Sequence, residues 1–130
     1  MIRFFRYHWK ALLWVIVICL GCLMPSVDMP RTSFFSKIPH FDKIVHFGLY
    51  FVYTLLLISG FLLQYPKEWA KAYLISGLLA FSCGILIEYL QFLMYLGRSA
   101  DFYDAIANTS GIILALLLFK PVQRLFPWAL

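Results

Sequence analysis

Charge is scarce in this chain. Only 13% of its 130 residues are charged, and six are acidic, whereas about a quarter of the residues in an average globular domain carry charge. Hydrophobic residues make up 63%. This composition excludes an ordinary water-soluble domain and predicts a membrane protein. The net charge is +5, but the cations lie at the ends of apolar segments instead of forming one basic face, so we expect no nucleic-acid partner.

Familiar catalytic motifs are also missing. The chain has no Gly-x-Ser-x-Gly, His-Glu-x-x-His, Walker-type loop or paired-cysteine motif, which leaves serine hydrolase, zinc peptidase and nucleotide-binding functions without support. Its three cysteines, Cys19, Cys22 and Cys83, lie inside apolar runs and are expected to be buried small side chains. Five residues carry side chains that can coordinate a hard cation: Asp42, His46, Glu88, Asp101 and Asp104. Their spacing in the sequence is not diagnostic of a metal site, so we predict no metal and no cofactor.

Four long apolar runs dominate what is present. They predict membrane spans at about residues 9–27, 43–63, 70–96 and 102–119, each near the roughly 20 residues that cross a bilayer. Short connections predict an all-α, up-down antiparallel bundle of four transmembrane helices, with residues 1–130 forming a single domain. The first run also has features of a cleaved signal peptide. Because it continues to Val27 and can therefore span, we expect it to be retained.

The distribution of Lys and Arg predicts the orientation. Seven of the eleven lie near the N-terminus, between the second and third spans, or near the C-terminus, so we expect both termini to be cytoplasmic. At the N-terminus they belong to an interfacial collar of basic and aromatic residues that includes Arg3, Arg6, His8 and Lys10.

Residues 97–111 form the densest polar stretch. At about 100° per helical residue, Asp101, Asp104 and Asn108 share one stripe with Gly111, which we expect to pack closely against another helix. Asp42 and His46 begin the second span, while Glu88 and Gln91 lie near the end of the third.

The polar residues of these three spans lie at similar depths. At about 1.5 Å per residue, His46, Glu88 and Asn108 are all roughly 6–12 Å from the outer ends of their spans. Polar groups within lipid are costly unless they face a partner or a water-filled cavity. The sequence therefore predicts one polar site, formed by the last three spans near the outer membrane surface.

Simpler roles remain open for several of these residues. Asp42, Asp101 and Asp104 fit helix caps equally well. His46 is also explained as a hydrogen-bonded interfacial histidine, and Arg98 as a topology charge, a salt-bridge partner or an anion contact. Glu88 and Asn108 lie too far from a helix end for such accounts.

Three blocks carry a family resemblance: Asp42-Lys43-Ile44-Val45-His46-Phe47, Glu88-Tyr89-Leu90-Gln91, and residues 97–111. In this order they resemble the VanZ-like family of small bacterial membrane proteins. The resemblance implies a multi-pass protein of the bacterial cytoplasmic membrane, and the family's name-giving member confers resistance to teicoplanin. The motif positions carry over without assigned roles: Asp42, Lys43, His46, Glu88, Gln91, Arg98, Asp101, Asp104, Asn108 and Gly111.

Two functions follow as hypotheses. In the first, a non-enzymatic pocket binds or shields a membrane lipid, a lipid-linked envelope precursor or the antibiotic. Its ligand-binding residues are Asp42, Lys43, His46, Glu88, Gln91, Arg98, Asp101, Asp104 and Asn108. In the second, the protein is an enzyme that modifies such a precursor, with His46, Glu88 and Asp104 as the catalytic candidates. A third possibility is that the polar residues only hold the helices together.

Overall fold

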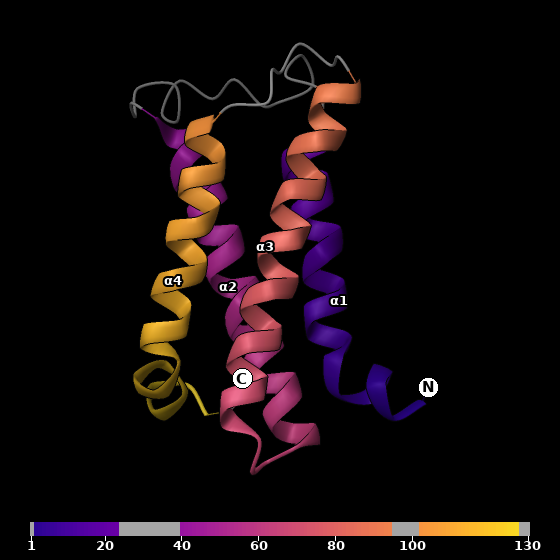
Figure 1. Cartoon of the computed structure of the whole chain (residues 1–130), viewed down its shortest axis with the longest axis vertical. Helices are drawn as coiled ribbons and strands as arrows, with labels where there is room; N and C mark the ends of the chain where they lie inside the picture. Colours follow the sequence, from indigo (N-terminus) through magenta and orange to yellow (C-terminus); the bar gives the residue numbers. More distant parts are fainter. Residues whose placement is uncertain (1, 24–39, 95–101, 128–130) are drawn as a thin grey trace.

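The fold is a bundle of long helices (Figure 1). The computed structural model describes residues 2–23, 40–94 and 102–127, and all regular secondary structure in these ranges is helical: α1 (Ile2–Leu23), α2 (Phe41–Gln64), α3 (Trp69–Met94) and α4 (Phe102–Leu125). All four helices include segments long and apolar enough to span a membrane. The prediction of an all-α membrane bundle is therefore confirmed.

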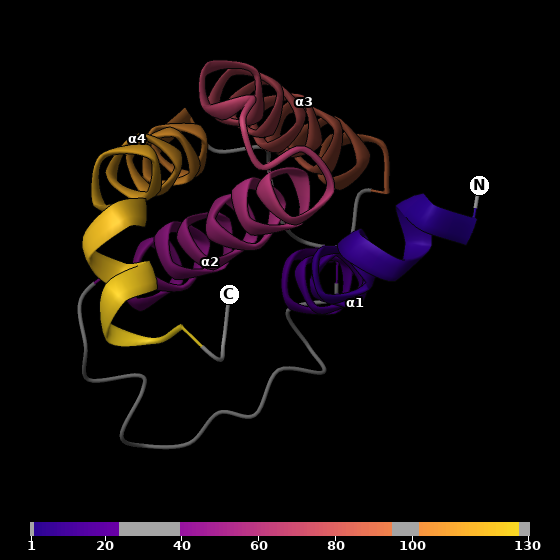
Figure 2. The ribbon, with the colours of Figure 1, turned by 90° about the horizontal axis from the view of Figure 1, so that it is seen from below.

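Helix α2 forms the centre of the bundle. Consecutive helices run in opposite directions, so both chain ends lie toward the same end of the bundle (Figure 1). Helix α2 packs against each of the other three, and the view from below shows α1 and α4 on opposite sides of it (Figure 2). Polar side chains on α2 can therefore meet partners from more than one neighbour.

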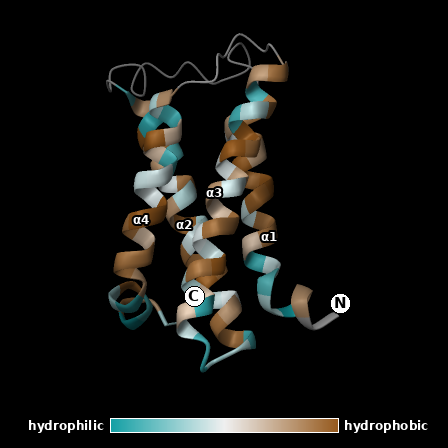
Figure 3. Ribbon diagram, viewed as in Figure 1, coloured by the Kyte–Doolittle hydropathy of each residue, from teal (hydrophilic) through white to brown (hydrophobic). Residues whose placement is uncertain are grey.

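Hydropathy varies along the helices, with apolar stretches in their middle parts and polar turns concentrated toward the ends (Figure 3). The outer faces of α3 and α4 expose large apolar side chains, including Leu74, Phe92 and Leu117. Exposure of this extent on a water-soluble protein would invite association, whereas lipid tails cover such a surface favourably.

Gly111 allows the backbones of α2 and α4 to approach closely. A Cβ atom at this position would collide with the carbonyl oxygen of Phe47 and would lie 3.1 Å from the backbone nitrogen of Phe51. The predicted close packing at Gly111 is confirmed, and it brings the polar residues of α4 against those of α2.

The helices extend beyond the predicted spans at two places. Helix α1 begins at Ile2 instead of about residue 9, and α4 continues through Pro121 to Leu125 instead of ending at about 119. Proline removes one backbone hydrogen bond and disfavours the helical turn before it, yet α4 is continuous through Pro121. The predicted span ends at 24–27 and 95–96 lie outside the described residues.

His8 is buried inside the bundle, whereas the sequence analysis placed it in the interfacial collar of basic and aromatic residues. Its side chain is only 1% exposed and packs against the rings of Phe4 and Phe61, with ring centroids 4.5 and 4.6 Å away. Gly60 explains the burial, because a Cβ at that position would lie 2.5 Å from Nδ1 of His8. His8 therefore helps to pack α1 against α2.

Candidate functional site

Five polar side chains from three helices meet at the end of the bundle opposite the chain termini. We call them the polar network: Lys43 and His46 from α2, Glu88 from α3, and Asp104 and Asn108 from α4. His46, Asp104 and Asn108 are almost completely buried, with exposures of 3%, 8% and 3%. The structure thus brings together residues that the sequence analysis assigned to one site.

Asn108 links α2, α3 and α4. Its Oδ1 atom lies 3.1 Å from Nδ1 of His46, and its Nδ2 atom donates a hydrogen bond of 3.4 Å to Oε1 of Glu88. Gly84 of α3 lies beside this contact: a Cβ there would be 3.7 Å from Nδ2 of Asn108, an ordinary van der Waals distance. The amide therefore uses both its polar ends within the bundle.

Lys43 connects two carboxylates. Its Nζ atom lies 2.6 Å from Oδ1 of Asp104 and 2.8 Å from Oδ2 of Asp42. The second oxygen of Asp104, Oδ2, lies 3.9 Å from Nε2 of His46. Charge-assisted contacts of this kind are stronger than neutral hydrogen bonds, so the Lys43–Asp104 pair joins the first turns of α2 and α4.

The helix-cap interpretation explains little of this arrangement. Asp104 lies in the first turn of α4 but pairs with a lysine from another helix. The N-cap residue of α2 is His40, with no side-chain capping hydrogen bond. Asp42 lies in the first turn of α2, is largely exposed and pairs with Lys43.

Four predicted ligand-binding residues are not among the five of the polar network: Asp42, which pairs with Lys43 at its edge, and Gln91, Arg98 and Asp101. Gln91 instead donates a buried 2.7 Å hydrogen bond from Nε2 to the backbone carbonyl of Cys22, which ties α3 to α1. Arg98 and Asp101 lie outside the described residues.

Tyr50 is a neighbour of the site that sequence analysis missed. Its side chain is fully buried, and its Cε1 atom would lie 3.5 Å from a Cβ at Gly84. The available signal was its position four residues after His46, which puts both on one face of α2. Tyr50 fills the space beneath the polar network, between α2 and α3.

A groove of about 180 Å³ adjoins the polar network between α3 and α4. Glu88 and Asn108 form the polar part of its wall. The other lining residues are mainly apolar or small: Phe81, Gly84, Ile85, Ala105, Thr109 and Ile112. Phe81 and Ile85 are exposed on the outer face of α3. The groove therefore connects the polar network with the surface that acyl chains would cover.

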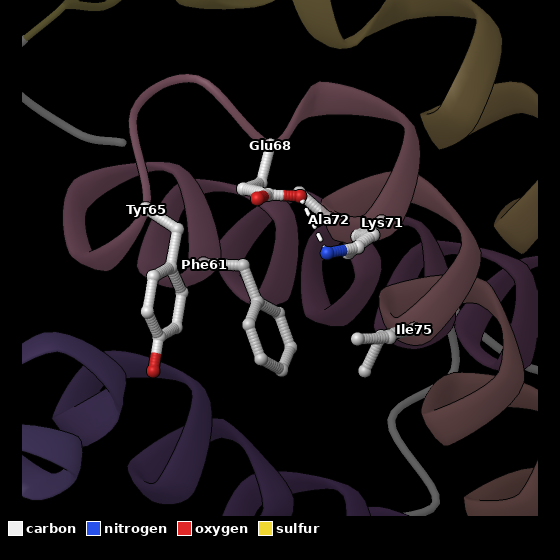
Figure 4. Close-up of a pocket in the computed structure, with 6 residues that line it drawn as sticks. All are labelled: Phe61, Tyr65, Glu68, Lys71, Ala72 and Ile75. Atoms are coloured by element: carbon white, nitrogen blue, oxygen red, sulfur yellow. Dashed lines mark ion pairs between the residues drawn. The ribbon is translucent and has the colours of Figure 1, made fainter.

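A second hollow of about 180 Å³ lies at the other end of the bundle, where α2 turns into α3 (Figure 4). Phe61, Ala72 and Ile75 give it apolar walls, and Glu68 and Lys71 form an ion pair of 2.9 Å at its edge. Because this pair is exposed, it is expected to contribute little to stability. Glu68 nevertheless provides a carboxylate far from the polar network for comparison.

The chemistry available to the polar network is acid–base chemistry or cation binding. One donor atom each from His46, Glu88 and Asp104 lie within 4.8 Å of one another. A histidine beside carboxylates can transfer protons, and the same three donors can also hold a metal ion. No separate cofactor-binding motif accompanies them in the sequence.

Comparison with known proteins gives a family and no individual relative. Neither the curated proteins nor the solved structures provide a match. The model of the VanZ/LLP1 family matches residues 3–126, nearly the whole chain, and it includes all three blocks on which the resemblance to VanZ-like proteins rests. The chain belongs to the VanZ/LLP1 family.

Proposed function

We propose that this protein is a binding protein of the bacterial cytoplasmic membrane that holds a membrane lipid or lipid-linked envelope precursor. The polar network contacts the head group, and the groove between α3 and α4 receives the adjoining hydrocarbon. By shielding its ligand, the protein lowers susceptibility to teicoplanin.

One observation carries this proposal: polar and apolar recognition groups adjoin in a single groove. Glu88 and Asn108 line it together with the outward-facing Phe81 and Ile85. Ligand sites commonly combine a mainly apolar lining with a few polar groups that fix orientation. A lipid-linked molecule has both parts, and an opening between two membrane helices lets it enter sideways from the bilayer.

The test compares bacteria that lack the protein with bacteria that express wild type, His46→Ala or Glu88→Gln. We expect wild type to lower teicoplanin susceptibility while the covalent composition of the lipid and precursor pools stays unchanged. Both variants should lose the effect at wild-type protein levels. Glu68→Gln is the matched control, because it removes a carboxylate at the opposite end of α3, and it should retain full effect. Unaltered susceptibility on expression of wild type would contradict the proposal.

A second function, enzymatic modification of the same precursor, is favoured by the 3.9 Å separation between Nε2 of His46 and Oδ2 of Asp104. A histidine next to a carboxylate can act as a general acid or base. The same experiment separates the two functions. A new covalent species in the precursor pool that is absent from both variants supports an enzyme.

A further inference from the structure

The orientation of the Asn108 amide determines which nitrogen of His46 carries hydrogen. Nδ2 of Asn108 donates to Glu88, and Oδ1 faces Nδ1 of His46 at 3.1 Å. Reversing the amide would turn its oxygen toward the Glu88 carboxylate, which also accepts hydrogen bonds when ionised. This network therefore assigns the hydrogen of a neutral His46 ring to Nδ1.

The other ring nitrogen then presents a lone pair to Asp104. Nε2 of His46 lies 3.9 Å from Oδ2 of Asp104, whose Oδ1 already accepts from Lys43. Two acceptors thus face each other in a buried setting, and one donor atom from each of His46, Glu88 and Asp104 lies within 4.8 Å of the other two. A cation bound between these atoms would accept their lone pairs and remove the repulsion between the two acceptors.

We infer that His46, Glu88 and Asp104 form a binding site for a divalent transition-metal ion. One imidazole nitrogen and two carboxylate oxygens suit Zn²⁺ or Mn²⁺ better than ions that prefer oxygen alone. Metal-binding histidines typically donate their other ring N–H to an oxygen that fixes the ring, which is the role of Oδ1 of Asn108. Linear sequence spacing predicted no metal, because the three ligands come from three different helices.

The three side chains would have to move closer together around the ion. Donors that bind Zn²⁺ at about 2.1 Å in a tetrahedral arrangement lie roughly 3.4 Å apart, compared with 3.9 Å between Nε2 of His46 and Oδ2 of Asp104 and separations of up to 4.8 Å within the set of three donors. Three protein ligands leave a further coordination position for water or an anionic ligand group. The inference stands on these side chains and does not require that the site binds lipid.

The experiment measures metal binding directly in the full chain, purified in detergent and stripped with a chelator. After incubation with Zn²⁺ or Mn²⁺ and removal of unbound ion, elemental analysis should give about one ion per chain. His46→Gln and Asp104→Asn should weaken affinity at least about tenfold, and Asn108→Leu, which removes the ring-orienting oxygen, should weaken it by about 10–100-fold. His40→Gln is the matched control from the same end of α2 and should bind as wild type does.

Cysteine is a competing zinc ligand, so Cys19, Cys22 and Cys83 are replaced together by serine in one further variant. This variant should keep its single ion, and Co²⁺ bound to wild type should lack thiolate charge-transfer absorption. Folded wild type that binds no stoichiometric ion overturns the inference, as does binding that survives His46→Gln or depends on the cysteines. If the ligand variants do not fold, the wild-type stoichiometry and the Co²⁺ spectrum decide. A metal-free result would leave the lipid-binding proposal standing, since that is tested separately in cells.

Discussion

Asn108 connects three helices through one amide group. It faces His46 on α2 and donates to Glu88 on α3 while lying on α4 itself. An amide suits this position because it offers a donor and an acceptor in opposite directions. Neither aspartate nor leucine can replace both functions, so the residue controls the stability of the network as well as the orientation of His46.

The first prediction concerns Asn108→Asp. The carboxylate would keep the shape of the side chain but lose the donor to Glu88 and place two acceptors next to each other. We expect the free energy of unfolding to fall by about 1–3 kcal/mol, the usual cost of an unsatisfied buried polar group. SDS-induced unfolding in detergent micelles measures this loss. Thr109→Val is the control, because the Thr109 hydroxyl only bonds to Ala105 within its own helix, and unchanged stability in both variants would contradict the prediction.

Lys43 is the second residue on which the site depends. It neutralises Asp104, which is otherwise a buried carboxylate at the junction of α2 and α4. Removing one partner of a buried ion pair costs about 3–5 kcal/mol, because the remaining charge stays desolvated. With Lys43 at 20% side-chain exposure, water reduces that penalty.

The prediction for Lys43→Met is therefore a loss of about 1–3 kcal/mol in the free energy of unfolding. The double variant Lys43→Met with Asp104→Asn should recover part of it, since no buried carboxylate then remains unneutralised. Measuring unfolding of both single variants and the double variant gives the coupling energy of the pair. Strictly additive losses would show that the ion pair contributes nothing.

At the scale of helices, the stripe on α4 was predictable and the role of Gln91 was not. Asp104, Asn108 and Gly111 follow helical spacing, and the structure confirms that Gly111 packs against α2. Gln91 follows the same spacing from Glu88 on α3, but its partner is the backbone carbonyl of Cys22. Every residue has a backbone carbonyl, so no sequence pattern identifies which one a side chain will reach.

Helix ends and helix pairing were also harder to predict than helix number. Apolar runs of about 20 residues are evident in the sequence, but the passage of α4 through Pro121 depends on its surroundings. The burial of His8 likewise depends on the space that Gly60 leaves in a neighbouring helix. Such features arise from contacts between elements, and the sequence of one element does not contain them.

Gly111 gives a prediction for the α2–α4 pair. In Gly111→Ala, the new methyl group would collide with backbone atoms of Phe47, and a backbone cannot move aside by changing a rotamer. We expect a loss of about 1–3 kcal/mol in the free energy of unfolding. Gly48→Ala in α2 is the matched control, because a Cβ there meets nothing within 4 Å, and it should gain up to about 1 kcal/mol. Equal effects at the two glycines would contradict the close approach.

For the whole molecule, the distribution of positive charge indicates which end of the bundle faces the cytoplasm. Both termini and the α2–α3 turn lie at one end of the bundle, and the polar network lies at the other (Figure 1). Seven of the eleven Lys and Arg residues belong to the first end. Among the remaining four, Lys43 is part of α2 and forms ion pairs with Asp42 and Asp104, so the two carboxylates neutralise its charge. The bias in positive charge therefore favours a cytoplasmic location for the termini.

This bias yields the prediction on which an outward-facing site depends. Alkaline phosphatase fused after Leu130 or after Lys67 should be inactive, because the enzyme folds only outside the cytoplasm, whereas a fusion after Ser33 should be active. A fluorescent protein that requires the cytoplasm should give the opposite pattern at the same three positions. Active alkaline phosphatase at Leu130 would invert the bundle and put Lys43, His46 and Asp104 at the cytoplasmic surface. Shielding of an external precursor from teicoplanin would then be excluded, while the metal site would remain possible, because its ligands are held within the bundle in either orientation.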